Sequence, residues 1–185
     1  MKSAPNENEH YITHSNRITG VVVLAIGVLG LIDILIEWRS LGGLTAALVI
    51  GAVMVVTYLG LIRPSIVLTP EQLRIRNHIR DHDVPWNLVE GADIADIVVV
   101  QTPQKRLRAP GVQLIMRDMR KQRLRGANGN DDSVSRAGFV VERIEQHAER
   151  YGKTAEGELS TRWAKLELSV LGGLIALAVV TWLLN

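Results

Sequence analysis

The sequence predicts an α+β membrane protein in which three transmembrane helices carry a small β-sheet or barrel domain between the second helix and the third. Three stretches are long and apolar enough to cross a bilayer, which takes roughly 20 helical residues. Between the second and third stretches, segments in which apolar and polar residues alternate, as in strands, are followed by one segment with apolar residues at helical spacing. The 185 residues are 47% hydrophobic and 22% charged, so the two populations must be separated along the chain.

The predicted spans cover residues 18–38, 41–62 and 166–184. Asp33 and Glu37 lie toward the end of the first span, Glu167 lies near the start of the third, and the second has no charge. The connection between the first two spans is so short that they must form a helical hairpin, entering and leaving on the same side. A cleaved signal peptide is the competing interpretation of the first span, but the apolar run is too long and Glu7 and Glu9 precede it.

Basic residues near the span ends predict the orientation. Only Arg39 lies between the first two spans, whereas the opposite side carries Lys2, Arg17, Arg63, Arg74, Arg76, Arg80, Arg150, Lys153, Arg162 and Lys165. The tail and the middle region should therefore be cytoplasmic, with Asn185 outside, in a multi-pass protein of a bacterial cell (inner) membrane. Trp38, Tyr58, Trp163 and Trp182 lie near span ends, where aromatic rings favour the membrane interface.

The middle region is patterned like a folded domain. Residues 65–69 and 73–77 flank a Pro-containing turn and predict a β-hairpin. Further strands are expected at 82–86, 97–100 and 111–118, and residues 120–125 should pair with the last of these. Trp86 is expected to anchor the core.

A helix should follow Ser133 or Ser135 and end at Gly152. Its apolar stripe consists of Val140, Ile144, His147, Ala148 and Tyr151. The chain then divides into a flexible N-terminal tail (1–17), a transmembrane helical hairpin (18–62), a cytoplasmic domain (63–152), a linker (153–165) and a third transmembrane helix (166–185).

The strand order, an internal Val-Pro-Trp and one closing helix resemble the bacterial pleckstrin-homology-like (PH-like) domains. In particular, they resemble the actinobacterial membrane proteins grouped with low-molecular-weight protein antigen six. The resemblance is carried by SIVLTPEQLRIRN (65–77), DVPWNLV (83–89) and the helix after Ser133, about half of the chain. The resemblance implies a PH-like barrel with a C-terminal helix and no catalytic residues. The first hairpin turn has an acid, Glu71, where phosphoinositide-binding PH domains use cations, so inositol-phosphate binding is not transferred to this chain.

Clustered cations form the main candidate site, a surface for lipid or partner binding. They are Lys105, Arg106, Arg108, Arg117, Arg120, Lys121, Arg123 and Arg125. Anionic lipid headgroups or an acidic partner would be attracted to such a surface, at about 1 kcal/mol per cation near the membrane. Solvated strand edges that prevent aggregation are the alternative. Nucleic acid is not expected as a partner, because no aromatic residue interleaves the cations.

The spans contain two further features. Small residues recur at every fourth position, at Gly43, Ala47 and Gly51 in the second span and at Gly172 and Ala176 in the third, as in closely packed membrane helices. They serve either packing within the chain or contact with another subunit. Asp33 is an intramembrane acid. An unpaired carboxylate there costs about 2.5 kcal/mol or more, so its side chain should face a helix neighbour, water or a partner subunit. Asp33 either handles protons or ions, or lies near the outer interface in contact with water or Arg39.

No enzyme, cofactor or metal site is predicted. The chain has no cysteine, and it shows no catalytic triad order and no glycine-rich phosphate loop. The pairs His10/His14 and His78/His82 have a spacing of four, but neither pair falls in a predicted helix.

We therefore expect a non-enzymatic inner-membrane protein with a scaffold or interaction role, whose cytoplasmic domain binds a protein or anionic lipid. The alternative is an accessory or assembly subunit of a larger integral membrane complex, with a respiratory complex as one candidate. A proton-handling component centred on Asp33 is the third hypothesis. The expected partners are the lipid bilayer, other membrane-protein subunits and anionic headgroups.

Overall fold

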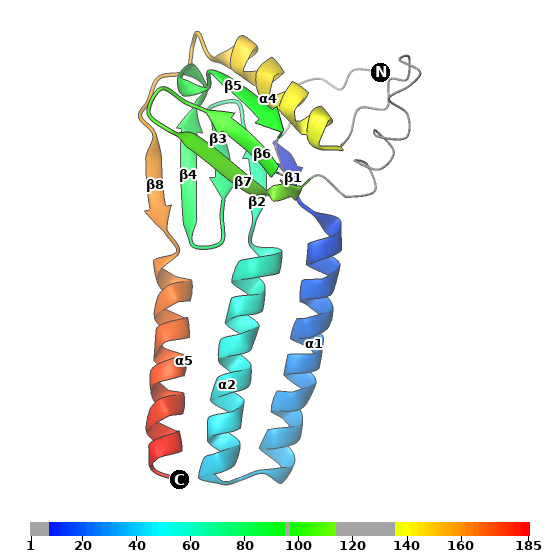
Figure 1. Ribbon diagram of the computed structural model, residues 1–185, viewed down its shortest axis with the longest axis vertical. Helices are drawn as coiled ribbons and strands as arrows, with labels where there is room; N and C mark the ends of the chain where they lie inside the picture. Colours follow the sequence, from blue (N-terminus) through cyan, green and yellow to red (C-terminus); the bar gives the residue numbers. More distant parts are fainter. Residues whose placement is uncertain (1–7, 95–96, 114–135) are drawn as a thin grey trace. The chain divides into compact units, whose positions relative to one another are not determined.

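The computed structural model describes residues 8–94, 97–113 and 136–185 of the chain. The chain divides into two compact units. The helix unit consists of His14–Arg63, His78–Arg80 and Trp163–Asn185, and the sheet unit of Met1–Thr13, Pro64–Asn77 and Asp81–Arg162. Helices together with two antiparallel sheets confirm the predicted α+β class (Figure 1).

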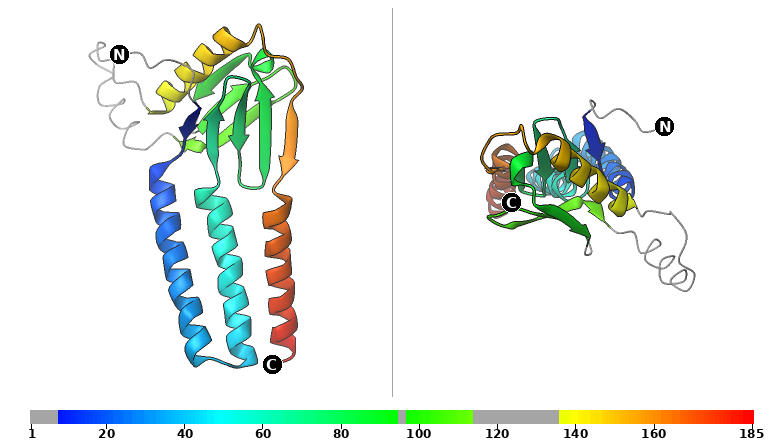
Figure 2. Two further views of the ribbon diagram at one scale, coloured as in Figure 1. Left: turned by 180° about the vertical axis from the view of Figure 1, so that it is seen from behind. Right: turned by 90° about the horizontal axis from the view of Figure 1, so that it is seen from above.

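Among the described residues, the helix unit contains three helices that are long and apolar enough to cross a membrane, in the same stretches as the sequence predicts. They are α1 (His14–Glu37), α2 (Leu41–Thr57, continued by a π-helical turn at Tyr58–Ile62) and α5 (Lys165–Leu183). α2 packs against both α1 and α5. Neighbouring helices are antiparallel, so the start of α1, the end of α2 and the start of α5 lie at one end of this unit (Figures 1 and 2).

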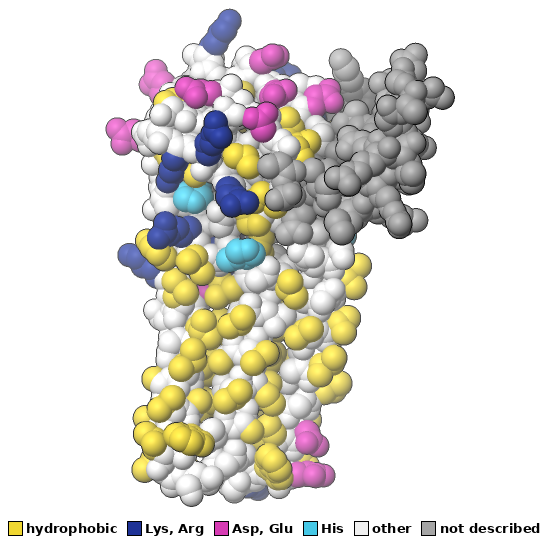
Figure 3. All heavy atoms as spheres, in the orientation of Figure 1, with side chains coloured by type: hydrophobic (Ala, Val, Ile, Leu, Met, Phe, Trp, Pro, Cys, Tyr) yellow, Lys and Arg dark blue, Asp and Glu magenta, His cyan; other side chains and the backbone are white. Residues whose placement is uncertain are grey.

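Two glycines of α1 allow close packing against α2. A Cβ atom added to Gly20 would lie 2.8 Å from a side-chain carbon of Ile62, and one added to Gly27 would lie 2.8 Å from Met54. Most other large apolar side chains of the helices are exposed, as Figure 3 shows on one face. Exposed apolar helix surface of this extent matches a hydrocarbon environment.

The first sheet has the strand order β1-β2-β3-β4-β8 and the second β5-β6-β7. The strands are β1 (Glu9–Tyr11), β2 (Ser65–Leu68), β3 (Gln72–Arg76), β4 (Arg80–Pro85), β5 (Gly91–Ile94), β6 (Ile97–Gln101), β7 (Arg106–Gln113) and β8 (Ser160–Trp163). The β2–β3 hairpin pairs Ile66 with Ile75 and Leu68 with Leu73. Alternate residues thus enter the core from both strands. The two sheets approach closely at Gly111, since a Cβ atom added there would lie 2.6 Å from the Ser65 Cα.

The core of the sheet unit lies between the two sheets and α4 (Arg136–Tyr151). Trp86 is 1% exposed and donates its indole N–H to the Thr69 carbonyl over 2.8 Å, as expected for a core anchor. Val140, Ile144 and His147 are buried on one side of α4, and Ala148 and Tyr151 are partly buried beside them, which confirms the predicted stripe.

Some element boundaries differ from the prediction. The 1–17 stretch, expected as a flexible tail, contains β1 and the start of α1, and the 153–165 linker contains β8. β7 begins at Arg106, not at Gly111, and its pairing with β6 is irregular near Pro110, which has no N–H to donate. The strand expected at 120–125 lies outside the described residues.

Candidate interaction surfaces

The described part of the predicted basic surface lies on β7 and the turn before it. Lys105, Arg106 and Arg108 are exposed, while the alternating Leu107 and Ala109 are 3% and 0% exposed. Strand alternation therefore puts both arginines on the outer side of the β5-β6-β7 sheet. We call these three cations the basic edge. The remaining predicted cations, Arg117, Arg120, Lys121, Arg123 and Arg125, lie outside the described residues.

No acid forms an ion pair with the basic edge in the part of the chain that the structure describes. The Lys105 ammonium lies 3.3 Å from the hydroxyl of Thr161. Asp93 on β5 is already bound by the side-chain amide of Gln101. Elsewhere in the sheet unit, Asp83 lies 2.6 Å from Arg74 and 2.9 Å from Arg162. The cations of the basic edge are thus available to an anionic surface.

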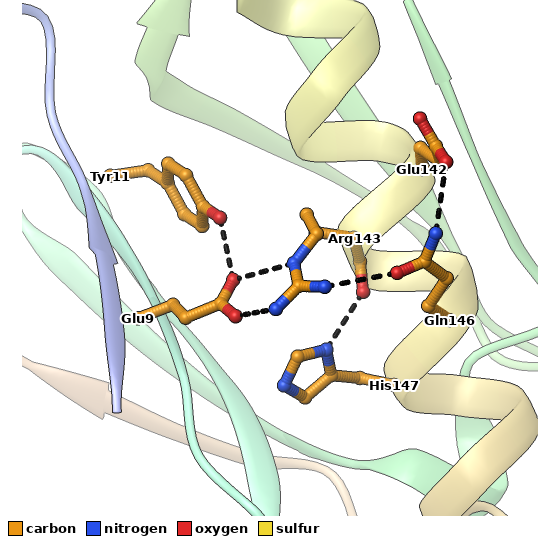
Figure 4. Close-up of polar contacts among 6 residues, drawn as sticks. All are labelled: Glu9, Tyr11, Glu142, Arg143, Gln146 and His147. Carbon is orange, nitrogen blue, oxygen red and sulfur yellow. Dashed lines mark hydrogen bonds and ion pairs between the residues drawn. The ribbon is translucent and has the colours of Figure 1, made fainter. Parts of the chain in front are cut away.

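A second polar cluster joins β1 to α4 (Figure 4). The Arg143 guanidinium donates to both carboxylate oxygens of Glu9, one of them at 3.0 Å from Nε. The Tyr11 hydroxyl donates to the same carboxylate over 2.5 Å, and its ring meets Phe139 edge-on at 6.3 Å. Gln146 accepts a third bond from Arg143 at 3.0 Å and so helps to orient the guanidinium. We call the Glu9–Arg143–Tyr11 group the clasp.

The clasp shifts the pKa values of its members. The hydrogen bond from Arg143 holds the pKa of the Glu9 carboxyl below its ordinary value of 4.5, although burial opposes this. Burial and the bond to Glu9 both raise the pKa of Tyr11, and the bond to Glu9 raises that of Arg143. These shifts favour an ionised Glu9, a protonated Tyr11 and a charged Arg143, which are the states in which the three groups bond to one another. The clasp therefore ties β1 to α4 through an ion pair and hydrogen bonds.

His147 lies beneath the clasp and is 2% exposed. Its Nδ1 lies 2.9 Å from the Arg143 carbonyl, and its ring is 5.3 Å from that of Trp86 and 5.7 Å from that of Tyr151. These contacts give the ring a packing role between α4 and the core.

The predicted small residues of the spans fall into different environments. Gly43 is buried against the end of α1, since an added Cβ would lie 2.1 Å from the Trp38 carbonyl oxygen. A Cβ atom added to Gly51 would lie 3.5 Å from a side-chain carbon of Leu174 on α5, which is an ordinary contact distance. Ala47 is partly buried, whereas Gly172 and Ala176 are exposed, and Gly172 has nothing within 4 Å of an added Cβ.

Asp33 lies on the exposed surface of α1, one turn before Glu37 and close to the end of the helix. An apolar groove of about 540 Å³ runs along α2 and α5 of the helix unit. Val53, Ile175 and Val179 are among its lining residues. Thr45 and Thr181 join the two helices there, with their hydroxyls 2.9 Å apart.

Sequence reasoning did not find the clasp or the α1–α2 glycine contacts. A signal was present for each: Glu9 and Tyr11 flank His10 in strand alternation, and Gly20 and Gly27 are seven residues apart, so they lie on one helix face. Comparison with known proteins gives no match, whether to a family model, to a curated protein or to a solved structure.

Proposed function

We propose that this chain is a non-enzymatic membrane protein whose sheet unit binds anionic lipid headgroups at the cytoplasmic face of a bacterial cell membrane. In this proposal the sheet unit is a PH-like domain of the actinobacterial type. Two antiparallel sheets, with the helix α4 packed against their core, support that assignment.

The observation that carries the proposal is the basic edge. Lys105, Arg106 and Arg108 are exposed together and have no acidic partner among the described residues. The chain enters the sheet unit from the end of α2 and leaves it into the start of α5, at the same end of the helix unit. Two short tethers keep the local concentration of these cations near the lipid high. Each cation close to an anionic leaflet contributes about 1 kcal/mol.

Hydrogen exchange of the full chain in nanodiscs tests the proposal. Amides of residues 101–108 should exchange more slowly in nanodiscs that contain anionic lipid than in purely zwitterionic ones. The difference should vanish in the triple variant Lys105→Gln, Arg106→Gln, Arg108→Gln. It should also shrink at about 1 M salt, where the screening length falls to roughly 3 Å.

The matched control neutralises three other cations of the sheet unit that are exposed: Arg76→Gln, Arg150→Gln and Lys153→Gln. This control should keep the lipid-dependent difference. Equal exchange of residues 101–108 in both kinds of nanodisc would refute the proposal.

A second candidate function is an accessory subunit of a larger integral membrane complex. The exposed small residues Gly172 and Ala176 on α5, and the apolar groove beside α2, favour it because a partner helix could approach closely there. Affinity purification in mild detergent followed by mass spectrometry should then give stoichiometric membrane subunits. Purification of the chain without them would exclude this candidate.

A further inference from the structure

Residues His78–Arg80, which include the last part of the connection between β3 and β4 and the first residue of β4, belong to the helix unit, although the rest of both strands belongs to the sheet unit. We call these three residues the β3–β4 turn. The turn bridges two helix ends, and both contacts use backbone groups that the helices leave without a partner.

The first contact is at the end of α2. In the π-helical turn, the Arg63 N–H donates to the Tyr58 carbonyl over 2.9 Å. The next carbonyl in this pattern, that of Leu59, would need an N–H from Pro64, which has none. The Nδ1 atom of His78 lies 3.2 Å from the Leu59 oxygen instead. Because a carbonyl oxygen only accepts, this contact is a hydrogen bond when Nδ1 carries a hydrogen.

The second contact is at the start of α5. Backbone N–H groups at a helix start have no partner within the helix. The Ala164 N–H donates to the carbonyl of Ile79 over 3.0 Å, and Arg80 lies 3.9 Å above the ring of Trp163. The turn is therefore held where the apolar stretch of α2 ends and that of α5 begins.

This position fixes the depth of three exposed side chains relative to the apolar helices. Ile79 is 41% exposed, Trp163 47% and Tyr58 40%. Aromatic rings at this level are typical of the membrane interface. Ile79 extends the apolar surface into the turn, next to the cation of Arg80.

Some of the described cations at this end of the helix unit have no acidic counterion. Arg63 is bound by Glu167 over 3.3 Å, and both side chains are mostly buried. Among the described residues no acid forms an ion pair with Arg80 or with the exposed Lys165. A guanidinium fixed over an aromatic ring keeps N–H donors free for a phosphate.

We propose that the β3–β4 turn and the start of α5 form a binding site for the phosphate headgroup of an anionic lipid, with Ile79 entering the interface beside it. Arg80 contacts the phosphate, Trp163 orients Arg80, and Lys165 adds a second cation. The choice of an anionic lipid agrees with the proposed function, but the site is separate from the basic edge.

Since the chain has no native cysteine, a single fluorophore can report the depth of the turn. The Ile79→Cys variant of the full chain, labelled and reconstituted in liposomes, should be quenched by lipids that carry a nitroxide near the headgroup. The control is a label at Glu71→Cys, an exposed residue at the other end of β3, about 17 Å along the strand. The control label should be quenched much less. An Ile79 label quenched no more than the Glu71 label would overturn the proposal.

Lipid mass spectrometry of the purified chain tests the headgroup. Arg80→Gln should lower the retained anionic lipid, relative to zwitterionic lipid, about fivefold, as expected for the loss of one cation near the surface. Arg80→Lys keeps the charge but not the planar guanidinium stacked on Trp163, so it should retain only part of the preference. Arg76→Gln, an exposed cation of the same hairpin, should keep the full preference.

Equal losses in Arg80→Gln and Arg76→Gln would overturn the specific site, because they would show attraction by charge alone. The same holds if neither variant changes the retained lipid. Failure of this site and failure of the proposed function are distinguishable, since the latter is measured by hydrogen exchange at residues 101–108.

Discussion

The clasp makes a quantitative prediction for the Glu9→Gln variant. Glutamine keeps the shape of the side chain but loses the charge that Arg143 binds through two hydrogen bonds. The side chains of Arg143 and Glu9 are 16% and 18% exposed, so the pair is screened less than a surface pair. Hydrogen bonds to charged groups contribute about 1.5–3 kcal/mol to stability, and we expect the free energy that holds β1 in place to fall by this amount.

Hydrogen exchange measures that loss directly. If detachment of β1 limits exchange, the amides of residues 9–11 should exchange roughly 10- to 150-fold faster in Glu9→Gln. The control Glu145→Gln removes an exposed acid of α4 and should leave these amides unchanged. A Glu9→Arg, Arg143→Glu double variant should recover part of the protection through the reversed pair. Wild-type exchange in Glu9→Gln would refute the view that the ion pair holds β1.

Three further predictions concern pH, the helix turn and the core. The pKa of Glu9 is lower in the folded chain than its ordinary 4.5, so the stabilisation is present above that value and lost as pH falls through the folded pKa. The difference in opening free energy between wild type and Glu9→Gln should therefore disappear at low pH; a difference that persists there would contradict the assignment. Gly43→Ala places a Cβ 2.1 Å from the Trp38 carbonyl oxygen, so it should lower the free energy of unfolding in micelles by about 1–3 kcal/mol. Gly172→Ala, where the added Cβ meets open space, should change that free energy by no more than about 0.5 kcal/mol. Equal effects of the two substitutions would contradict the packing of Gly43 against Trp38. Ile144→Ala should lower the stability of the sheet unit by about 2–5 kcal/mol in urea titration, and a loss below 1 kcal/mol would show that α4 does not close the core.

The elements that the sequence predicted correctly have strong periodic signals. The three spans are long and apolar, and the α4 stripe repeats over several turns, so each signal is averaged over many residues. The β2–β3 hairpin has alternating strands around a Pro-containing turn, and it was placed within a few residues.

The elements that were missed are short or depend on distant partners. β1 has three residues, and its pairing with β2 and its ion pair with Arg143 join positions far apart in sequence. β5 includes Gly91 and Asp93, which have low strand propensity, so its pairing with β6 is what makes it a strand. The turn at His78–Arg80 shows no sequence signal of its own, because its position depends on the carbonyl that Pro64 leaves unpaired.

The most direct test of the proposed membrane topology determines on which side of the membrane the α1–α2 connection and the sheet unit lie. Single cysteines can be placed at Ser40, between α1 and α2, and at Glu71 in the sheet unit, since the chain has no cysteine of its own. In intact cells a membrane-impermeant maleimide should label Ser40→Cys at once and Glu71→Cys only after the membrane is permeabilised. Labelling of both positions from the outside would contradict the account.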